Sequence, residues 1–426
     1  MKKIKKFVDE VTYAFKKVPY YGNLLNEEVI AQIKANPEHA VNVIPYSSKV
    51  DYRKNFPRGI LAKGFSPQHP MVISSRSSGT TGERTITLEL GMLLLQRALS
   101  TSKISPEIYQ IMANKDRKIV RFAAPNCSDV ECANPNSGME ERLLPDNTLV
   151  LPVYHDLMTT PDRMLDKAIE EVEMFKPDLF YVDPTHFAFL LLAYKKRGLT
   201  PPQIPVILSY TATTRAARRI INEFFPMHLT SQLLSSTEFG WIAMECPHGH
   251  LHVNDDGFFP EFKALEPDSI AGQNTASTLK ELCLTSLDKG ACPHIRYTTG
   301  DIVSVVGNPL EAKCECGSDR QRMVVEGRIS YFLKKQGQPF MSPQQVDAVV
   351  GAPTWLNFYQ LEQIKDEEFA LKLVVNEAYQ EEAEAPMVAA LKAAIGSTIK
   401  IDTRVVEYIS TERSGKFQAV KGVAHV

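Results

Sequence analysis

Seven hydroxyl side chains and two glycines share the segment 74–85, whose sequence is SSRSSGTTGERT. Glycine lets main-chain N–H groups come close to an anion, and consecutive N–H groups form a concave site for phosphate oxygens. Ser and Thr hydroxyls add further donors. The residues that we expect to contact phosphate are Ser77, Ser78, Gly79, Thr80, Thr81 and Gly82. A solvated Ser/Gly turn is the alternative for this segment taken alone.

The segments on either side of this loop are typical of β-strands. A short apolar run, residues 71–73, precedes the loop, and residues 85–90 alternate polar and apolar side chains as a half-buried strand does. A Walker-type loop instead ends in Gly-Lys and a hydroxyl residue at the start of a helix. Here Arg84 stands five residues after Gly79 and a strand follows. The sequence therefore predicts a strand–loop–strand hairpin that presents its loop to phosphate.

The SSGTTG loop between two strands resembles the ATP-phosphate loop of the acyl-adenylate-forming (ANL) enzymes, and most closely that of the phenylacetate–CoA ligase-like branch. Further motifs similar to that family's follow in the same order along the whole chain. They are STEFG at 236–240, RYTTGD at 296–301, GR at 327–328 and SGK at 414–416.

The resemblance implies a role for each matching residue. Thr237 would bind phosphate, and Glu238 would hold the Mg²⁺ ion that bridges ATP oxygens, a hard cation that carboxylates suit. Asp301 would bond the ribose hydroxyls, because two acceptor oxygens suit a vicinal diol, and Arg328 would reach ribose or phosphate. Lys416, on a glycine-containing loop, would be delivered to the α-phosphate. Lys416, Thr237 and Glu238 are the catalytic residues that we expect.

Three features depart from the family's pattern. Glu83 follows the second loop glycine, where the family usually has Lys. An anion beside a triphosphate is unfavourable unless it points away, so Arg84 is the expected cation there. Leu234 and Ser235 replace the family's aromatic residue, which stacks on adenine, and the glycine after it. The segment 210–213 does not match the family's Gly-Ala-Glu-like adenine contact, and no role is carried over to it.

A second group of residues has the types that bind zinc. CPHGHLH at 246–252 is followed at 314–316 by CEC. Four nitrogen or sulfur ligands close a structural zinc site, and the alternating histidines share one face of a strand. These clusters resemble the zinc site of some phenylacetate–CoA ligase-like proteins. The ligands that this resemblance implies are Cys246, His252, Cys314 and Cys316. Free thiols and surface histidines are the alternative.

Composition places the chain among ordinary globular proteins. It has 426 residues, 44% of them hydrophobic and 23% charged, and a net charge of −2, so nothing predicts a nucleic-acid or anionic-membrane surface. The basic N-terminus is followed by no apolar segment of a secretory signal. The longest apolar run, residues 187–194, is too short to span a bilayer. Seven cysteines without a disulfide-framework density favour a reduced, cytoplasmic setting.

The elements that must position these residues alternate in type. Strands such as 179–182 and 204–210, each followed by a helical segment, predict α/β layers around a mainly parallel sheet. Ligands of such sheets lie beyond the C-terminal ends of the strands. We expect a large multi-layer α/β N-terminal domain and a small α+β C-terminal domain. By resemblance, 1–328 is the AMP-binding domain and 329–426 is the small mobile domain with the lysine loop.

The resemblance implies a two-step reaction. A carboxylate oxygen attacks the α-phosphate of ATP and gives acyl-AMP and pyrophosphate; the small domain then rotates, and coenzyme A takes the acyl group. The protein's task is alignment and charge neutralisation rather than proton transfer. We therefore expect an acid–CoA ligase for an aryl or arylacetic acid, with ATP, Mg²⁺, coenzyme A and structural Zn²⁺ as cofactors. A homodimer is the expected assembly, with neither nucleic acid nor membrane as partner.

Two alternatives stay open. The acyl-adenylate is passed to an amine or a carrier protein, as in relatives from secondary metabolism, or the chain is a non-catalytic nucleotide- or acid-binding homologue. Glu83, Leu234 and Ser235 are the features that favour the non-catalytic alternative.

Overall fold

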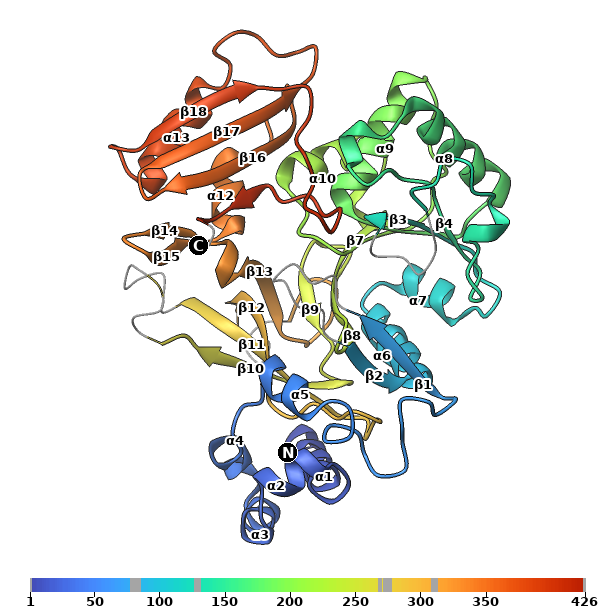
Figure 1. The fold of residues 1–426 in the computed structure, drawn as a ribbon, viewed down its shortest axis with the longest axis vertical. Coiled ribbons are helices and arrows are strands. Elements are labelled where there is room, and N and C mark those ends of the chain that lie inside the picture. Colours follow the sequence, from blue (N-terminus) through green and yellow to red (C-terminus); the bar gives the residue numbers. More distant parts are fainter. Residues whose placement is uncertain are drawn as a thin grey trace.

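A long mixed sheet connects most of the molecule (Figure 1). The computed structural model describes residues 2–76, 86–125, 132–266, 270, 278–307 and 313–423. Within them, an 11-stranded sheet has the order β10-β11-β12-β13-β9-β8-β7-β6-β5-β3-β4. The predicted phosphate loop, residues 77–82, and the neighbouring Glu83 and Arg84 lie outside the described residues, as does Cys127.

The N-terminal region is a group of short helices at the bottom of Figure 1. Their bounds are α1 (Lys2–Lys17), α2 (Pro19–Leu24), α3 (Glu27–Ala35), α4 (Ala40–Val43) and α5 (Lys49–Asn55). The apolar stripe of α1 is fully buried, because Phe7, Val11 and Ala14 recur at helical spacing. A capping box between Ser48 and Asp51 starts α5. This start fixes the place of Lys49, the first residue of α5.

The predicted hairpin is confirmed on both sides of its loop. Strands β1 (Val72–Arg76) and β2 (Ile86–Leu90) pair antiparallel, with Arg76 opposite Ile86. The helical pattern at 91–113 forms two helices rather than one, α6 (Gly91–Ser102) and α7 (Pro106–Ala113). The break precedes Pro106 because proline has no backbone N–H for an intrahelical bond and therefore favours the first turn of a helix.

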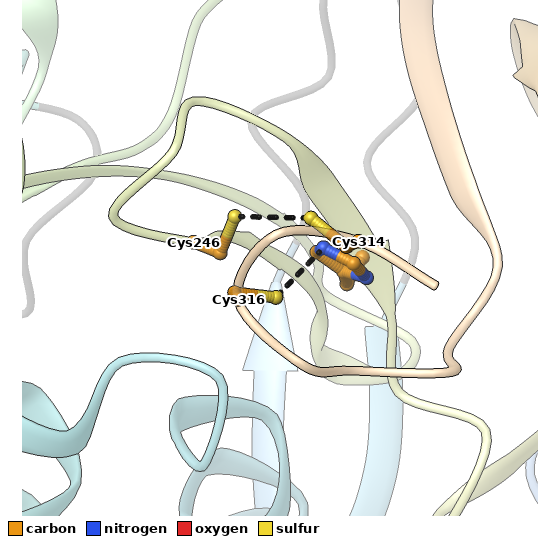
Figure 2. Close-up of side chains that lie close together, drawn as sticks. Cys246, Cys314 and Cys316 are labelled. Atoms are coloured by element: carbon orange, nitrogen blue, oxygen red, sulfur yellow. Dashed lines mark hydrogen bonds between the residues drawn. The ribbon is translucent and has the colours of Figure 1, made fainter. Parts of the chain in front are cut away.

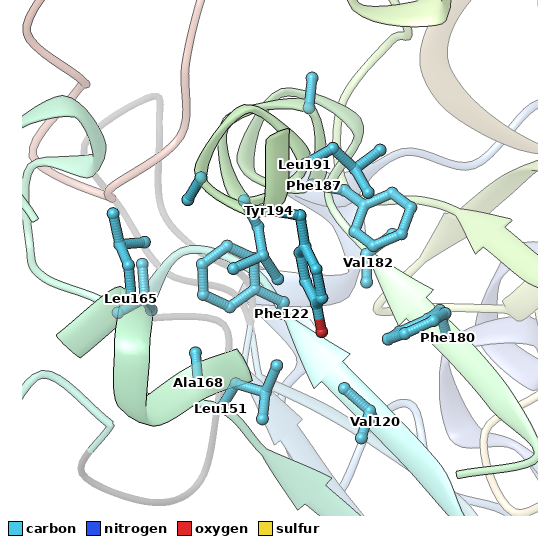
Figure 3. Packing of buried hydrophobic residues seen from close by; sticks show 14 of the residues in the cluster. Val120, Phe122, Leu151, Leu165, Ala168, Phe180, Val182, Phe187, Leu191 and Tyr194 are labelled. Carbon is cyan, nitrogen blue, oxygen red and sulfur yellow. The ribbon is translucent and has the colours of Figure 1, made fainter. Parts of the chain in front are cut away.

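One half of the large sheet is parallel and has helices on both faces. Its strands are β3 (Ile119–Phe122), β4 (Thr148–Val150), β5 (Leu179–Val182), β6 (Val206–Leu208) and β7 (Thr230–Ser236). The connecting helices are α8 (Asp162–Phe175), α9 (Pro184–Lys196) and α10 (Arg215–Asn222). Figure 3 shows Phe187 and Leu191 of α9 packed on Phe122 of β3 and Val182 of β5. Helices α6 and α7 pack on the opposite face.

The other half of the sheet is antiparallel. Its strands are β8 (Gly240–Glu245), β9 (Leu251–Val253), β10 (Phe258–Ala264), β11 (Leu279–Ser286), β12 (Tyr297–Val306) and β13 (Arg322–Arg328). The prediction of a mainly parallel sheet is therefore wrong beyond β7. A short turn joins β7 to β8, and antiparallel neighbours need no crossover helix.

The C-terminal lobe is a small α+β unit at the upper left of Figure 1. A two-stranded ribbon precedes a four-stranded sheet of order β18-β17-β16-β19. The elements are β14 (Leu333–Lys335), β15 (Gln338–Met341), α12 (Pro343–Val350), β16 (Leu356–Lys365), β17 (Glu368–Val375), α13 (Ala385–Ile395), β18 (Lys400–Val405) and β19 (Val420–Lys421). The expected fold class, a large α/β domain followed by a small α+β domain, is confirmed.

The two lobes touch through a limited set of contacts. Asp347 of α12 accepts hydrogen bonds from the backbone N–H of Arg215, the first residue of α10, at 3.0 and 3.3 Å. Arg219 of α10 donates to the carbonyl of Leu356 at 2.6 Å. Phe417, on the C-terminal segment that crosses toward the green lobe in Figure 1, is buried in the core of the large domain.

Among the residues that the structure describes, no helix is both long and apolar enough to cross a membrane.

A buried charge network joins α1 to the first helix after the hairpin. Arg97 of α6 forms ion pairs with Glu89 at 3.0 Å and with Asp288 at 2.6 Å. Glu10 of α1 lies beside this network and accepts the backbone N–H of Lys289 at 3.0 and 3.2 Å. Burial, reinforced by the nearby Asp288 carboxylate, raises the pKa of Glu10 to about 8. The folded chain therefore favours the neutral form of Glu10.

This burial predicts a pH-dependent stability. With the folded pKa raised, the contribution of Glu10 is fully present below its unfolded pKa and is lost as pH rises through about 8. Glu10→Gln removes that loss. The free energy of unfolding of the variant should therefore exceed that of wild type by roughly 1–4 kcal/mol at pH 9 and equal it at pH 5. Denaturant titrations from pH 5 to 9 check this. Glu28→Gln, at an exposed glutamate, should show the same dependence of unfolding free energy on pH as wild type. If the Glu10→Gln curve also runs parallel to that of wild type, the prediction is contradicted.

Candidate active site

The lysine of the C-terminal loop lies at the edge of the parallel sheet. Strand β6 ends at Leu208, and Ser209, Tyr210 and Thr211 follow it. Lys416 Nζ donates a hydrogen bond to the carbonyl oxygen of Tyr210 at 3.3 Å. A residue of the small lobe thus reaches the C-terminal end of a central strand of the large lobe, where ligands of parallel sheets bind.

Backbone geometry holds the lysine loop in this place. Gly415 has φ +75°, and its N–H donates to the carbonyl of Glu412 at 2.7 Å. The N–H of Glu412 in turn donates to the carbonyl of Lys416 at 2.9 Å. A Cβ added at Gly415 would lie 3.0 Å from Cβ of Ala124, directly after β3. Glycine is needed here both for the left-handed φ and for this close approach.

A second group of candidate residues lies where β7 turns into β8. Thr237 and Glu238 are half-buried in this turn, which is closed by a hydrogen bond from the N–H of Phe239 to Ser236 Oγ at 3.2 Å. The hydroxyl of Tyr297 faces Glu238 Oε1 at 3.5 Å. Burial raises the pKa of Tyr297, and the Glu238 carboxylate raises it further.

Asp301 and Arg328 pair across two neighbouring strands. They stand opposite each other in the register of β12 and β13, and Arg328 Nε lies 3.3 Å from Asp301 Oδ1. Burial raises the pKa of Asp301, while the guanidinium of Arg328 acts in the opposite direction. Glu238 also acts electrostatically on both residues. The expected metal, ribose and phosphate residues therefore share one electrostatic environment.

Lys49 belongs to this environment and was not among the expected site residues. Burial lowers the pKa of Lys49; the Glu238 carboxylate opposes this shift, and the guanidinium of Arg328 adds to it. Ser47, two residues before Lys49, pairs with Tyr297 and so ties the start of α5 to β12. The sequence shows a capped helix start at Ser48, but a lone lysine there carries no sign of a contact more than 180 residues away.

The two groups of residues lie on neighbouring strands. Ser209, after β6, and Ser235, near the end of β7, have hydroxyl oxygens 3.2 Å apart. Ser235 stands where the family has a glycine. Leu234, which replaces the family's aromatic residue, packs against the core of the antiparallel half. The described residues therefore place Thr237, Glu238, Asp301, Arg328 and Lys416 along one side of the sheet; the six loop residues 77–82 lie outside the described ranges.

The four candidate zinc ligands are brought together. Figure 2 shows the cysteines of the two clusters facing one another, and one ligand atom from each of the four residues lies within 4.8 Å of the others. Cys246 Sγ is 3.9 Å from Cys314 Sγ, and Cys316 Sγ is 3.6 Å from Nε2 of His252. Turns close both cysteine segments, with Gly249 N–H donating to the Cys246 carbonyl.

A hydrogen bond orients the histidine of this cluster. Nδ1 of His252 lies 3.1 Å from the carbonyl oxygen of Arg320, so that nitrogen carries the proton and donates. Nε2 is then left with a lone pair that faces the sulfurs, as in metal-bound histidines whose second nitrogen is hydrogen-bonded. Three sulfurs and one nitrogen form a donor set that fits a closed tetrahedral zinc site. Nδ1 of His250 lies 3.3 Å from Cys314 Sγ, beside this set.

Comparisons with known proteins find relatives among CoA ligases. The phenylacetate–coenzyme A ligase of Thermus thermophilus is 25% identical over 391 residues, covering 87% of this chain and 80% of that ligase. The phenylacetate–coenzyme A ligase of Pseudomonas putida is 24% identical over 306 residues, 69% of this chain and 64% of that ligase. A family described as the CapK C-terminal domain matches residues 333–422, in the small lobe.

A solved structure shares the fold over nearly the whole chain. It is a 2-hydroxyisobutyryl-CoA ligase in the postadenylation state, in complex with R3-HIB-AMP, with a TM-score of 0.68 and 15% identity over 99% of this chain and 89% of that one. The chain thus has the fold of this CoA ligase. The sequence relatives that it resembles are phenylacetate–coenzyme A ligases, the family whose motifs it was expected to share.

The close approach at Gly415 predicts how the lysine loop can be displaced. Gly415→Ala should push the loop away from Ala124, so hydrogen–deuterium exchange of residues 410–417 should accelerate by about 10-fold or more. Gly337→Ala is the matched control: Gly337 also has a left-handed φ, +80°, but no atom of the described chain lies within 4 Å of the added Cβ. Equal exchange in the two variants would show that the collision does not displace the loop.

Proposed function

We propose that this protein activates a carboxylic acid with ATP, forms an acyl-adenylate and pyrophosphate, and transfers the acyl group to coenzyme A. The observation that carries the proposal is the contact of Lys416, from the small lobe, with the Tyr210 carbonyl at the ligand-binding edge of the large lobe. The family relationship supports the same reaction, because the homologues named above are phenylacetate–coenzyme A ligases.

Each charged side chain has a task in adenylation. The reaction moves negative charge onto the α-phosphate and the leaving pyrophosphate, so fixed cations favour the transition state. Lys416 binds the α-phosphate, and Lys49 and Arg328 supply positive charge around Glu238. The hairpin loop 77–82 binds the outer phosphates, and Asp301 binds the ribose hydroxyls.

Magnesium fits the turn between β7 and β8. Glu238 is a half-buried carboxylate whose neighbour is the hydroxyl of Tyr297, and carboxylate oxygens are ligands that Mg²⁺ prefers. Glu238 would hold the ion with oxygens of ATP, and Thr237 would bind an adjacent phosphate. The ion, when bound, neutralises phosphate charge and aligns the triphosphate.

Aromatic rings beside the lysine contact support an aryl or arylacetic substrate. The ring centroids of Tyr181 and Tyr210 are 5.2 Å apart, and Trp241 stacks on Tyr181 with the centroids 5.9 Å apart. These side chains come from β5, the turn after β6 and β8. Aromatic pairs favour such offset and tilted arrangements, and a further ring joins them readily.

The division of the chain follows from this chemistry. Residues 1–328 bind nucleotide and acid, and residues 329–426 form the mobile domain that delivers Lys416 and then rotates to admit coenzyme A. The polar bond between Asp347 and Arg215 lies beside the apolar packing of Phe417, and such mixed interfaces between domains allow relative motion.

The Cys/His cluster is a structural zinc site with Cys246, His252, Cys314 and Cys316 as ligands. Its geometry supports this: the ligand atoms converge, and the second nitrogen of His252 is held by a backbone carbonyl. None of the six cysteines that the structure describes forms a disulfide, which supports a reducing compartment such as the cytoplasm. The homodimer stays a prediction.

Acid-dependent exchange of pyrophosphate into ATP tests the first step. Across a panel of aromatic and aliphatic acids, exchange should be fastest with aryl or arylacetic acids, and Lys416→Ala should lower it by roughly 100-fold or more, because the developing phosphate charge loses its cation. Lys400→Ala, at an exposed lysine of the small lobe, is the control and should retain wild-type exchange.

Product analysis then separates the three functions. A thioester with coenzyme A supports the ligase, whereas hydroxamate or amide products with added amines, and no thioester, favour transfer to an amine or carrier protein. If the protein binds ATP but shows no pyrophosphate exchange with any acid tested, the result would favour the non-catalytic nucleotide- or acid-binding homologue.

Metal analysis tests the zinc site. Purified protein should contain about one zinc ion per chain, and Cys314→Ser should lose it and unfold at a lower temperature, because the site ties two segments far apart in the sequence. Cys283→Ser changes a buried thiol in β11 and should keep the metal. Elemental analysis of both variants checks this; retention of zinc by Cys314→Ser would remove Cys314 from the ligand set.

A further inference from the structure

The turn that receives Lys416 has an unusual backbone conformation. Tyr210 has φ +72°, and the N–H of Thr211 donates to the carbonyl of Ser209 at 2.9 Å, which closes a three-residue γ-turn. Positive φ is unfavourable for a residue with a bulky side chain, and such a conformation persists only where its surroundings hold it. Strained residues of this kind concentrate at functional sites.

A buried carboxylate holds this turn. Asp183, fully buried at the end of β5, accepts a hydrogen bond at Oδ2 from the hydroxyl of Thr211 at 2.7 Å. Its Oδ1 accepts the backbone N–H groups of Thr185 and His186 at 2.9 and 3.1 Å, and so caps the start of α9. Asp183 thus couples the rigid N-terminus of α9 to the Tyr210 turn.

The turn presents the carbonyl oxygen of Tyr210, which binds Lys416. An ammonium group has three donors, and Lys416 gives one of them to Tyr210 O. Within the described part of the chain the other two donors have no acceptor, and in the proposed reaction they bind oxygens of a phosphate. The direction of the Tyr210 carbonyl therefore decides where the charge of Lys416 stands relative to the sheet edge.

We propose that Asp183 and Thr211 are positioning residues of the adenylation step: they hold the Tyr210 turn in the conformation that seats Lys416 against the nucleotide. This inference rests on the proposed function. The contact between Lys416 and the Tyr210 carbonyl exists only while the small lobe is docked as observed, because the lysine leaves when that lobe rotates. Loss of this contact should therefore slow adenylation and leave the transfer to coenzyme A intact.

A purely structural role makes a different prediction. If Asp183 serves only to cap α9, removal of the Thr211 hydroxyl lowers stability, and any loss of activity affects both half-reactions alike. The two roles are therefore separable by kinetics.

The test compares Thr211→Val, which keeps the shape and loses the hydroxyl, with Thr211→Ser, which keeps the hydroxyl. Thr211→Val should lower the kcat of ATP–pyrophosphate exchange by about 10- to 100-fold, with KM for ATP changed by less than about 3-fold, because misplacement of a catalytic group affects the chemical step. Thr211→Ser should stay within about 3-fold of wild type. Thioester formation from preformed acyl-adenylate and coenzyme A should be unchanged in both variants.

A double variant shows whether the effect passes through the lysine. In a Lys416→Ala background, Thr211→Val should cause no further loss of exchange, since residues that act as a unit are not additive. Losses that multiply, or equal losses in the two half-reactions, would overturn the proposal. If wild type shows no exchange with any acid, the proposed function fails instead. In that case, hydrogen exchange of residues 410–417 tests whether Thr211 holds the lysine loop in place. Protection from exchange should fall in Thr211→Val and persist in Thr211→Ser. Equal protection in the two variants would overturn the positioning role of Thr211.

Discussion

The docking of the small lobe on the end of β6 is the contact on which the rest of the site depends. Apolar packing and a few polar bonds hold it: Phe417 lies in the core of the large domain, and Asp347 stands at the N-terminus of α10. The carboxylate is well placed for the helix dipole, yet burial raises its pKa to about 6, so the bond is only moderately favourable near neutral pH. An interface of this kind can hold a lysine in place and still release it.

The site gathers charges of both signs before any ligand arrives. Lys49 and Arg328 lie close to Glu238 and Asp301, all of them at least half-buried. Charges fixed in a partly dry site act more strongly on a phosphate than they would in water, and they need little reorganisation during the reaction. The mixture matters, because the cations of Lys49 and Arg328 alone would repel each other. Glu238 and Asp301 balance the charges of Lys49 and Arg328.

Short motifs predicted candidate residues because the members of each motif lie within a few positions of one another. RYTTGD at 296–301 and SGK at 414–416 led to Asp301 and Lys416, whose roles stay predictions. The paired Cys and His clusters led to four side chains that the fold does bring together. Lys49 and the Asp183–Thr211 bond could not be found in this way, since each depends on strands that meet only in the fold. The positive φ of Tyr210 has no local signal, because glycine would be the expected residue at such a position. The parallel sheet was extended too far because alternation of strands and helices stops at β7, while strands alone do not show their direction.

Strand β13 connects the Cys/His cluster to the Asp301–Arg328 pair. It begins at Arg322, opposite His252 of β9, and ends at Arg328, opposite Asp301 of β12. A register shift of one residue would send every side chain of the strand to the other face. Zinc bound to His252 and to the cysteines just before β13 would fix the beginning of this strand, and therefore the pairing at its end. Glu326, near that end, accepts the hydroxyl of Ser342 at 2.5 Å, where the small lobe starts α12. A metal bound by these four residues would thus act on the candidate active site through one strand: it would fix the register of β13, which ends at the Asp301–Arg328 pair and leads into the small lobe.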